Sequence, residues 1–153
     1  MKRYLVVLLA VIGLSSASAQ SDPFVGGSFD LLFVGGSTFV SLDAQAGDYG
    51  LFDSFGGRAT LGLGFTPGVY LRLASDVIFP FNLESGDITP YAGGGFGLIT
   101  RGGTLFDIHA LGGAEFEVAD QLGLFGEVVP SLFISGGTAF GVGLRFGGNY
   151  HFE

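Results

Sequence analysis

The carboxyl-terminal end of the chain alternates between large apolar residues and small or polar residues with a period of two. From Thr138 to Phe152, Phe, Val, Leu and Tyr fill most even positions, and Ala, Gly, Arg, Asn and His fill the odd ones. Successive side chains of a β-strand point to opposite faces, so this pattern predicts one long strand with one strongly apolar face. Such a strand needs either an apolar core or lipid against that face.

The amino-terminal end has the three parts of a secretory signal peptide. A basic start at residues 1–3 precedes an apolar run at 4–14 and a small-residue cleavage motif, Ala17-Ser18-Ala19. The apolar run is shorter than the roughly 20 residues that a membrane-spanning helix needs. We therefore predict that residues 1–19 are a cleaved signal peptide and that residues 20–153 form one mature domain.

Composition narrows the class of this domain. The chain has no Cys, which excludes a disulfide framework and a lipoprotein acylation site. Beyond residue 19 it has four Arg and no Lys against 14 acidic residues, so we predict no nucleic-acid partner. Hydrophobic residues make up 48% of the chain, charged residues 13%, and there are 29 Gly. So much Gly disfavours helices and so few charges disfavour a soluble surface, whereas strands in a membrane accommodate both.

Turn-forming clusters rich in Gly, Pro, Ser and Asp divide the mature chain into eight segments. Each segment is long enough, or nearly so, for a tilted membrane strand of ~9–11 residues. We predict strands at 25–34, 37–45, 56–65, 69–79, 89–99, 107–118, 122–133 and 138–152.

Several connections between these segments are too short for a parallel crossover, which needs roughly a dozen residues or more. They are Gly35-Gly36, Thr66-Pro67-Gly68, Ala119-Asp120-Gln121 and Ser135-Gly136-Gly137. Neighbouring strands therefore form antiparallel hairpins, and the predicted topology is an up-and-down meander. We predict longer links at 46–55, 80–88 and 100–106.

In each segment one face is free of charge and the other face collects the charged residues. The charged face contains Asp30, Asp43, Arg58, Arg72, Asp76, Asp107, Glu115, Glu117, Glu127 and Arg145. A closed sheet with its apolar face in lipid satisfies every backbone polar group. The sequence therefore predicts an all-β fold, an eight-stranded antiparallel up-and-down transmembrane β-barrel whose lumen holds the charged groups.

Inward charges of both signs predict a polar network that fills the lumen. Its predicted members are Arg58, Arg72, Asp76, His109, Glu115, Glu117, Glu127 and Arg145. Eight-stranded barrels have interiors just wide enough for side chains to fill, so we expect ion pairs that plug the barrel. Because inward carboxylates outnumber arginines, a narrow cation-preferring pore is an alternative.

A soluble barrel that binds an apolar ligand would show the same alternation turned inside out. Its polar face would be the outer surface and would be rich in Lys and Glu. Here that face is dominated by Gly, Ser, Thr and a few charges, which favours a crowded lumen and a membrane barrel.

Motifs for chemistry are weak in this chain. A lipid-modifying hydrolase would need a Ser beside a His and a carboxylate, and neither spacing nor parity singles out Ser131, His109 and Glu127 for that role. Asp43, Asp48 and Asp53 recur every five residues, but they do not form a calcium-binding loop motif. We therefore predict no catalytic residues, no metal site and no cofactor.

The end of the last segment resembles the sorting signal on the final strand of outer-membrane barrels. Arg145, Gly147, Tyr150 and Phe152 occupy its four places, although Glu153 follows where the commonest form ends on the aromatic residue. The resemblance implies recognition by the barrel-insertion machinery.

Glycine-aromatic patterns elsewhere extend this resemblance over most of the mature chain. They lie at 90–97, 109–116 and 124–127, and with the last strand they resemble the small outer-membrane barrels of the OmpA and OmpX type. This resemblance implies an outer-membrane location, the lipid bilayer as a partner, and a non-enzymatic role in envelope structure or surface interaction. The resemblance implies a location and a fold rather than one specific role, because one fold serves many functions.

Two features fit a barrel less well. Pro130 lies inside a predicted strand and lacks the N–H that the ladder uses, so we predict a bulge or an early strand end there. If both termini lie in the periplasm, the outer loops would be shorter than the periplasmic turns, the reverse of the usual pattern. Short outer loops leave little surface for adhesion.

Overall fold

A computed structural model describes residues 22–52, 54–66, 68–81, 87–100 and 102–152. The predicted signal peptide lies outside the described residues. The strands are β1 (Pro23–Val34), β2 (Ser37–Phe52), β3 (Phe55–Thr66), β4 (Tyr70–Pro80), β5 (Ile88–Thr100), β6 (Thr104–Ala119), β7 (Leu122–Ile134) and β8 (Thr138–His151).

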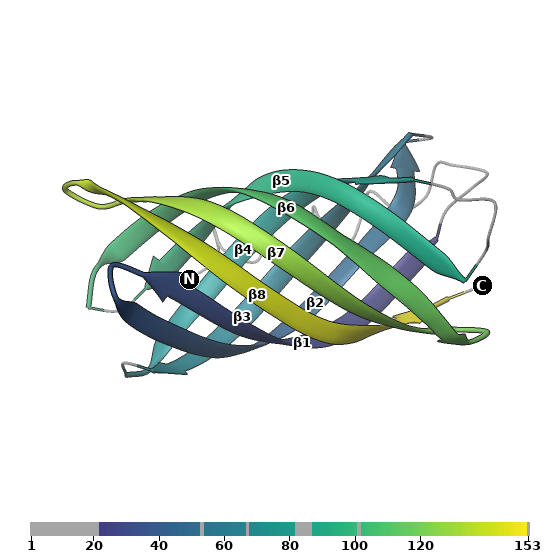
Figure 1. Ribbon diagram of the computed structural model, residues 1–153, viewed down its shortest axis with the longest axis horizontal. Coiled ribbons are helices and arrows are strands. Elements are labelled where there is room, and N and C mark those ends of the chain that lie inside the picture. The colour runs from purple at the N-terminus through teal and green to yellow at the C-terminus, as the bar shows by residue number, and fades with distance from the viewer. Residues whose placement is uncertain (1–21, 53, 67, 82–86, 101, 153) are drawn as a thin grey trace, which may run out of the picture.

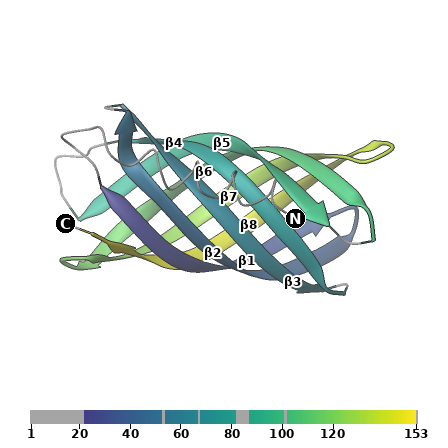
Figure 2. The same cartoon turned by 180° about the vertical axis from the view of Figure 1, so that it is seen from behind.

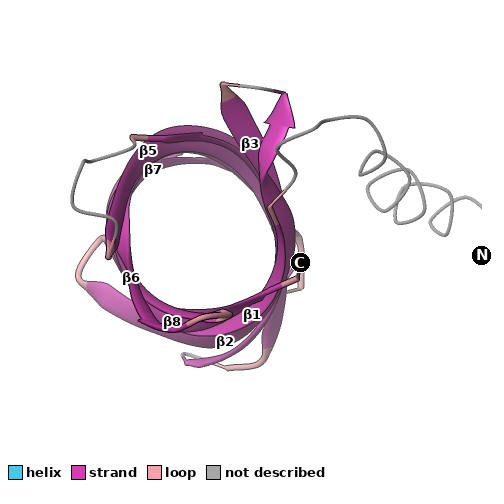
Figure 3. Ribbon diagram, turned by 90° about the vertical axis from the view of Figure 1, so that its right-hand side faces the viewer, coloured by secondary structure: helices cyan, strands magenta, loops and turns pink. Residues whose placement is uncertain are grey.

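Each strand pairs with its sequence neighbours in antiparallel register, and β8 closes the sheet by pairing with β1. Figures 1 and 2 show the strands running obliquely around the barrel, and Figure 3 shows the closed ring viewed from one end. The predicted all-β, eight-stranded, up-and-down barrel is therefore confirmed. Closure leaves no edge strand, so the ladder can satisfy the backbone all the way round.

Two predicted links are wrong because strands continue through them. The link at 46–55 is instead the end of β2, which runs to Phe52, and the link at 100–106 shrinks to three residues between β5 and β6. In β2 the register against β3 shifts between Asp48 and Phe52, so the residues between them form an irregularity rather than a loop. The Asp48 carboxylate accepts hydrogen bonds from the backbone N–H groups of Asp22 at 2.9 Å and Gly50 at 2.7 Å. These bonds hold a Gly- and Asp-containing segment in the sheet despite its turn-like composition.

The bulge or early strand end predicted at Pro130 is also wrong. β7 continues through Pro130, which pairs with Val142 of β8. Pairing between β7 and β6 runs to Ser131 and resumes at Val128 in the same register. The sheet therefore tolerates the N–H that proline lacks, without a bulge or a strand end.

The outer surface of the barrel is an apolar belt. Exposed Leu and Val side chains lie between two levels of exposed aromatic rings, one near the short turns and one near the chain termini. The first level includes Phe33, Phe65, Phe106 and Phe140, and the second Phe79, Phe116, Tyr150 and Phe152. Ten residues of β8 separate Phe140 from Tyr150, a rise of about 25 Å for a strand tilted by about 40°, which matches the apolar band of membrane barrels.

The belt rules out the inside-out alternative of a soluble barrel around an apolar ligand. Leu61, Leu73 and Val128 are each about half exposed on the outside, whereas Arg58, Asp76 and Arg145 are buried in the lumen. No helix in the described part of the chain combines the length and hydropathy needed to cross a membrane.

The lumen is layered along the barrel axis. On β4, Tyr70 lies nearest the short turns, Arg72 and Asp76 follow, and Ile78 lies toward the termini. Tyr70 packs with Ile99 and Phe133, whereas Ile78 belongs to a separate apolar cluster that reaches Phe24 and Tyr49. On β4 the charged residues Arg72 and Asp76 therefore lie between two apolar layers.

Candidate functional site: the barrel lumen

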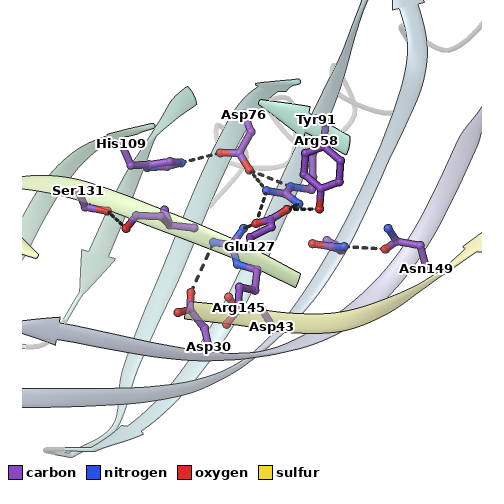
Figure 4. A network of polar contacts seen from close by, with 12 residues as sticks. Asp30, Asp43, Arg58, Asp76, Tyr91, His109, Glu127, Ser131, Arg145 and Asn149 are labelled. Atoms are coloured by element: carbon purple, nitrogen blue, oxygen red, sulfur yellow. Dashed lines mark hydrogen bonds and ion pairs between the residues drawn. The ribbon is translucent and has the colours of Figure 1, made fainter. Parts of the chain in front are cut away.

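The centre of the lumen is an ion-pair chain whose side chains are fully buried. Arg58 of β3 and Asp76 of β4 are direct cross-strand partners, and the Arg58 Nε donates to Asp76 Oδ2 at 2.9 Å. The same guanidinium forms a two-point ion pair with Glu127 of β7, with Nη2 at 3.1 Å from Oε2. The Tyr91 hydroxyl donates to the other Glu127 oxygen at 2.8 Å. Figure 4 shows these groups converging from strands on opposite sides of the barrel.

Arg145 extends the chain to β1. It is the direct cross-strand partner of both Glu127 and Asp30. Its Nη1 donates to Glu127 Oε2 at 2.9 Å, and its Nη2 lies 3.5 Å from Asp30 Oδ2. Arg72 reaches the same Asp30 oxygen at 2.7 Å. Glu127 and Asp30 each therefore lie between two guanidinium groups.

His109 joins the network through both ring nitrogens. Nε2 lies 2.7 Å from Asp76 Oδ1, and Nδ1 lies 2.5 Å from Asp107 Oδ1. With both carboxyl groups ionised, each can only accept, so both ring nitrogens would donate and the ring would be an imidazolium cation. Ser131 is the cross-strand partner of His109, but its hydroxyl donates to the Val129 carbonyl at 3.4 Å instead. This geometry leaves His109 without a free nitrogen to act as a base toward Ser131.

Glu115 belongs to a second network, closer to the termini. Its carboxylate accepts hydrogen bonds from Tyr49 at 3.0 Å and Asn149 at 2.6 Å, and lies 2.5 Å from His151 Nε2. His151 Nδ1 in turn lies 2.8 Å from Asp22. The partners are hydroxyl, amide and imidazole groups rather than the arginines expected from the sequence. Parity placed His151 inward, but Tyr49 lay in a segment predicted to be a loop, so its role was missed.

Glu117 departs from the predicted network. It has the same strand parity as Glu115, but its side chain is exposed, and it lines the open mouth of the barrel. The register between β6 and β7 shifts between Glu117 and Ala119, where the sheet ends. At Glu117, two residues beyond Glu115, the lumen is no longer enclosed, so an inward position there is exposed.

The mouth at this end is a cavity of about 410 Å³. Asp22, Tyr49, Glu115, Glu117 and His151 contribute to its wall. The described residues contain no group of three or more His, Cys, Asp or Glu arranged to hold a metal ion. Of the three aspartates that recur every five residues, Asp43 and Asp48 lie in β2, and Asp53 falls outside the described residues.

The four residues of the predicted insertion signal divide between the two faces of β8. Arg145 is buried in the lumen and Gly147 is partly buried, while Tyr150 and Phe152 are exposed on the outside, with ring centroids 5.3 Å apart. A Cβ on Gly147 would collide with the Gly27 carbonyl and the Phe125 ring. In the folded barrel this glycine therefore has a packing role in addition to any role in sorting.

At the level of sequence, no family model and no curated protein matches the chain. Several solved structures match it in fold. Neisserial surface protein A aligns with a TM-score of 0.69 and 13% identity over 90% of this chain and 100% of that one. The amino-terminal β-barrel domain of Pseudomonas aeruginosa OprF aligns with a TM-score of 0.56 and 14% identity over 86% of this chain and 100% of that one. The attachment invasion locus protein Ail of Yersinia pestis aligns with a TM-score of 0.53 and 11% identity over 86% of this chain and 97% of that one.

Identities this low show the fold alone, and that fold agrees with the apolar belt, the closed ladder and the charged lumen described above. In architecture the chain is a closed eight-stranded antiparallel up-and-down β-barrel, similar in fold to these small outer-membrane barrels.

Proposed function

We propose that this protein is a structural barrel of the outer membrane with a closed lumen, and that it is neither an enzyme nor an open pore. The observation that carries the proposal is the buried ion-pair chain from Asp76 and Arg58 to Glu127 and Arg145. β3 and β4 lie opposite β7 and β8 in the ring, so this chain of contacts crosses the lumen. An ion would have to separate buried, hydrogen-bonded charges to pass, which is costly.

A cation-preferring pore is the main alternative. The excess of inward carboxylates favours it, but each central arginine is directly paired, and Arg145 has no exposed surface. An enzymatic role has less support, because the lumen histidine is held between two carboxylates.

A role in surface interaction also has limited support. At the end away from the termini, the turns are only a few residues long and include Gly35, Gly36, Gly102 and Gly136 with positive φ. If the termini lie in the periplasm, this end faces outward and presents little more than turn backbone. Ail is named as an attachment invasion locus protein. A role in attachment needs an exposed binding surface, which these turns do not provide. We therefore favour envelope structure over adhesion.

The test is a conductance measurement on protein extracted from the outer-membrane fraction. We expect a band whose electrophoretic mobility changes on boiling, and no single-channel steps in a planar bilayer. The matched control is the double variant Glu127→Ala with Arg145→Ala, which removes the central pairs and should conduct if it folds, thereby showing that insertion and detection work. Stepwise cation currents from the unaltered protein would overturn the closed-lumen proposal.

We further propose that residues 1–19 are removed on export and that the insertion machinery recognises β8. The sequence patterns at the two ends of the chain support this proposal. Mass spectrometry of protein from the membrane fraction should give a chain that begins at Gln20. A mature chain that retains the apolar run at 4–14 would contradict it.

A further inference from the structure

The charges at the centre of the lumen do not balance. Five buried carboxylates face three arginines and one imidazolium, which leaves one excess negative charge. The acidic groups are Asp30, Asp43, Asp76, Asp107 and Glu127, and the cations are Arg58, Arg72, Arg145 and His109. Burial of an uncompensated charge is costly, so this excess calls for a further positive charge.

The excess charge can be assigned to Asp43. Among the described residues, each of the other four carboxylates has a cationic group at 2.9 Å or closer. Of the cations in the described ranges, Arg72 makes the ion-pair contact with Asp43: its Nη1 lies 3.9 Å from Asp43 Oδ2 and is already bound to Asp30 at 2.7 Å.

Within the described part of the chain, both oxygens of Asp43 are buried without a hydrogen-bond partner. Its neighbours carry charges of both signs: Arg72 and Arg145 attract the Asp43 carboxylate, and Asp30 repels it. The Ser41 hydroxyl lies beside the carboxylate but does not meet either oxygen with hydrogen-bond geometry. Asp43 is about 95% buried, so bulk water cannot solvate it fully.

The wall around Asp43 holds further buried oxygens without partners. Ser28 of β1 is its direct cross-strand partner, and Gln45 is the next inward residue of β2, opposite Thr60 of β3. Ser28 Oγ, Gln45 Oε1 and Thr60 Oγ1 are all buried and have no hydrogen-bond partner among the residues that the structure describes. Paired residues in adjacent strands lie about 5 Å apart, so these oxygens share one patch of wall across β1, β2 and β3.

We propose that Asp43 and this patch bind one small monovalent cation of the sodium type inside the lumen. Carboxylate, hydroxyl and amide oxygens are the ligands that hard cations prefer. One positive charge matches the excess, whereas a divalent ion would be repelled by the adjacent Arg72 and would find only two nearby carboxylates. The site does not depend on whether the barrel conducts, because it lies on the wall beside the ion-pair chain rather than across it.

The experiment compares thermal unfolding of the detergent-extracted barrel in sodium chloride and in choline chloride at equal ionic strength. Choline is too large for a buried site. We expect the midpoint in sodium to be higher by about 3 °C or more. Asp43→Asn should have equal midpoints in the two salts, while the control Asp120→Asn, at an exposed turn, should keep the difference.

A second variant keeps the test decisive if Asp43→Asn does not fold. Thr60→Val preserves the shape of the side chain and removes one ligand oxygen, so it should reduce the sodium-dependent shift. The proposal is overturned if the unaltered barrel unfolds at the same temperature in both salts, as it would if Asp43 carried a proton. It is also overturned if the shift survives unchanged in Asp43→Asn or in Thr60→Val.

Discussion

The hairpin of β7 and β8 is regular, whereas the hairpin of β2 and β3 is not. β7 pairs with β8 in one unbroken register from Leu122 to Ile134. β2 and β3 change register twice, near Val40 and between Asp48 and Phe52. The regular hairpin supplies two directly paired charges, Glu127 and Arg145, while β2 supplies Asp43, whose ion-pair contact among the described residues is a long one, with Arg72 at 3.9 Å. On the regular hairpin a buried charge faces an opposite charge across the ladder. The ladder partners of Asp43 are Ser28 and Gly62, so only groups elsewhere in the lumen can compensate its charge.

The largest effect should come from the regular hairpin, at Arg145. Arg145→Met removes a buried cation that contacts both Glu127 and Asp30. We expect a loss of about 3–5 kcal/mol in the free energy of unfolding, because the two carboxylates lose a buried partner. Urea titration of the barrel in lipid vesicles, followed by its electrophoretic mobility, measures this loss. A loss below about 1 kcal/mol would show that the pairs contribute little net stability.

A charged substitution on the outer face should have the same effect in both hairpins, although their inward-facing residues differ. Leu144→Arg on β8 and Leu61→Arg on β3 each place a cation in the apolar belt. We expect each to cost about 2–4 kcal/mol if the site is near the bilayer midplane, and to reduce the amount found in the membrane fraction. The same urea titration, combined with fractionation, tests this. Normal stability and membrane yield for both variants would contradict the lipid-facing assignment.

The irregular end of β2 should depend on one carboxylate. Asp48→Ala removes the acceptor for the backbone N–H groups of Asp22 and Gly50. We expect a loss of about 1–2 kcal/mol and faster hydrogen exchange at these two amides, because the bonds hold the irregular segment in the sheet. Exchange at the β7 and β8 amides should remain slow. Equal acceleration in both hairpins would show that Asp48 acts on the whole barrel.

The smallest effect on stability should come from the last aromatic residue. Phe152→Ala removes an exposed ring just beyond β8, so the folded barrel should lose about 1 kcal/mol or less. Assembly in cells should fall more strongly if Phe152 is part of the insertion signal. Phe140→Ala, on the same face of β8 but outside the signal, is the matched control. Equal assembly of the two variants would argue against recognition of the carboxyl-terminal pattern.

The sequence was sufficient to predict much of the lumen's composition. Arg58, Asp76, Glu127 and Arg145 were placed inward from strand parity, and the structure has them in one network. Parity alone could not place Glu117, because whether an inward position is enclosed depends on where the barrel ends. It also could not pair Glu115, whose partners Tyr49 and Asn149 lie 66 and 34 residues away in the chain.

The eight strands, their faces and their order around the ring followed from the sequence by itself, because period-two alternation and short turns are local properties. The tertiary structure alone decided that β2 continues to Phe52, that Glu127 lies between two arginines, and that Asp43 lacks a close cation. These features depend on contacts such as Arg58 with Glu127 and Gln45 with Asn149, which are 69 and 104 residues apart. Such contacts form only when the sheet closes, and the register of eight strand pairs determines which side chains then meet across the lumen.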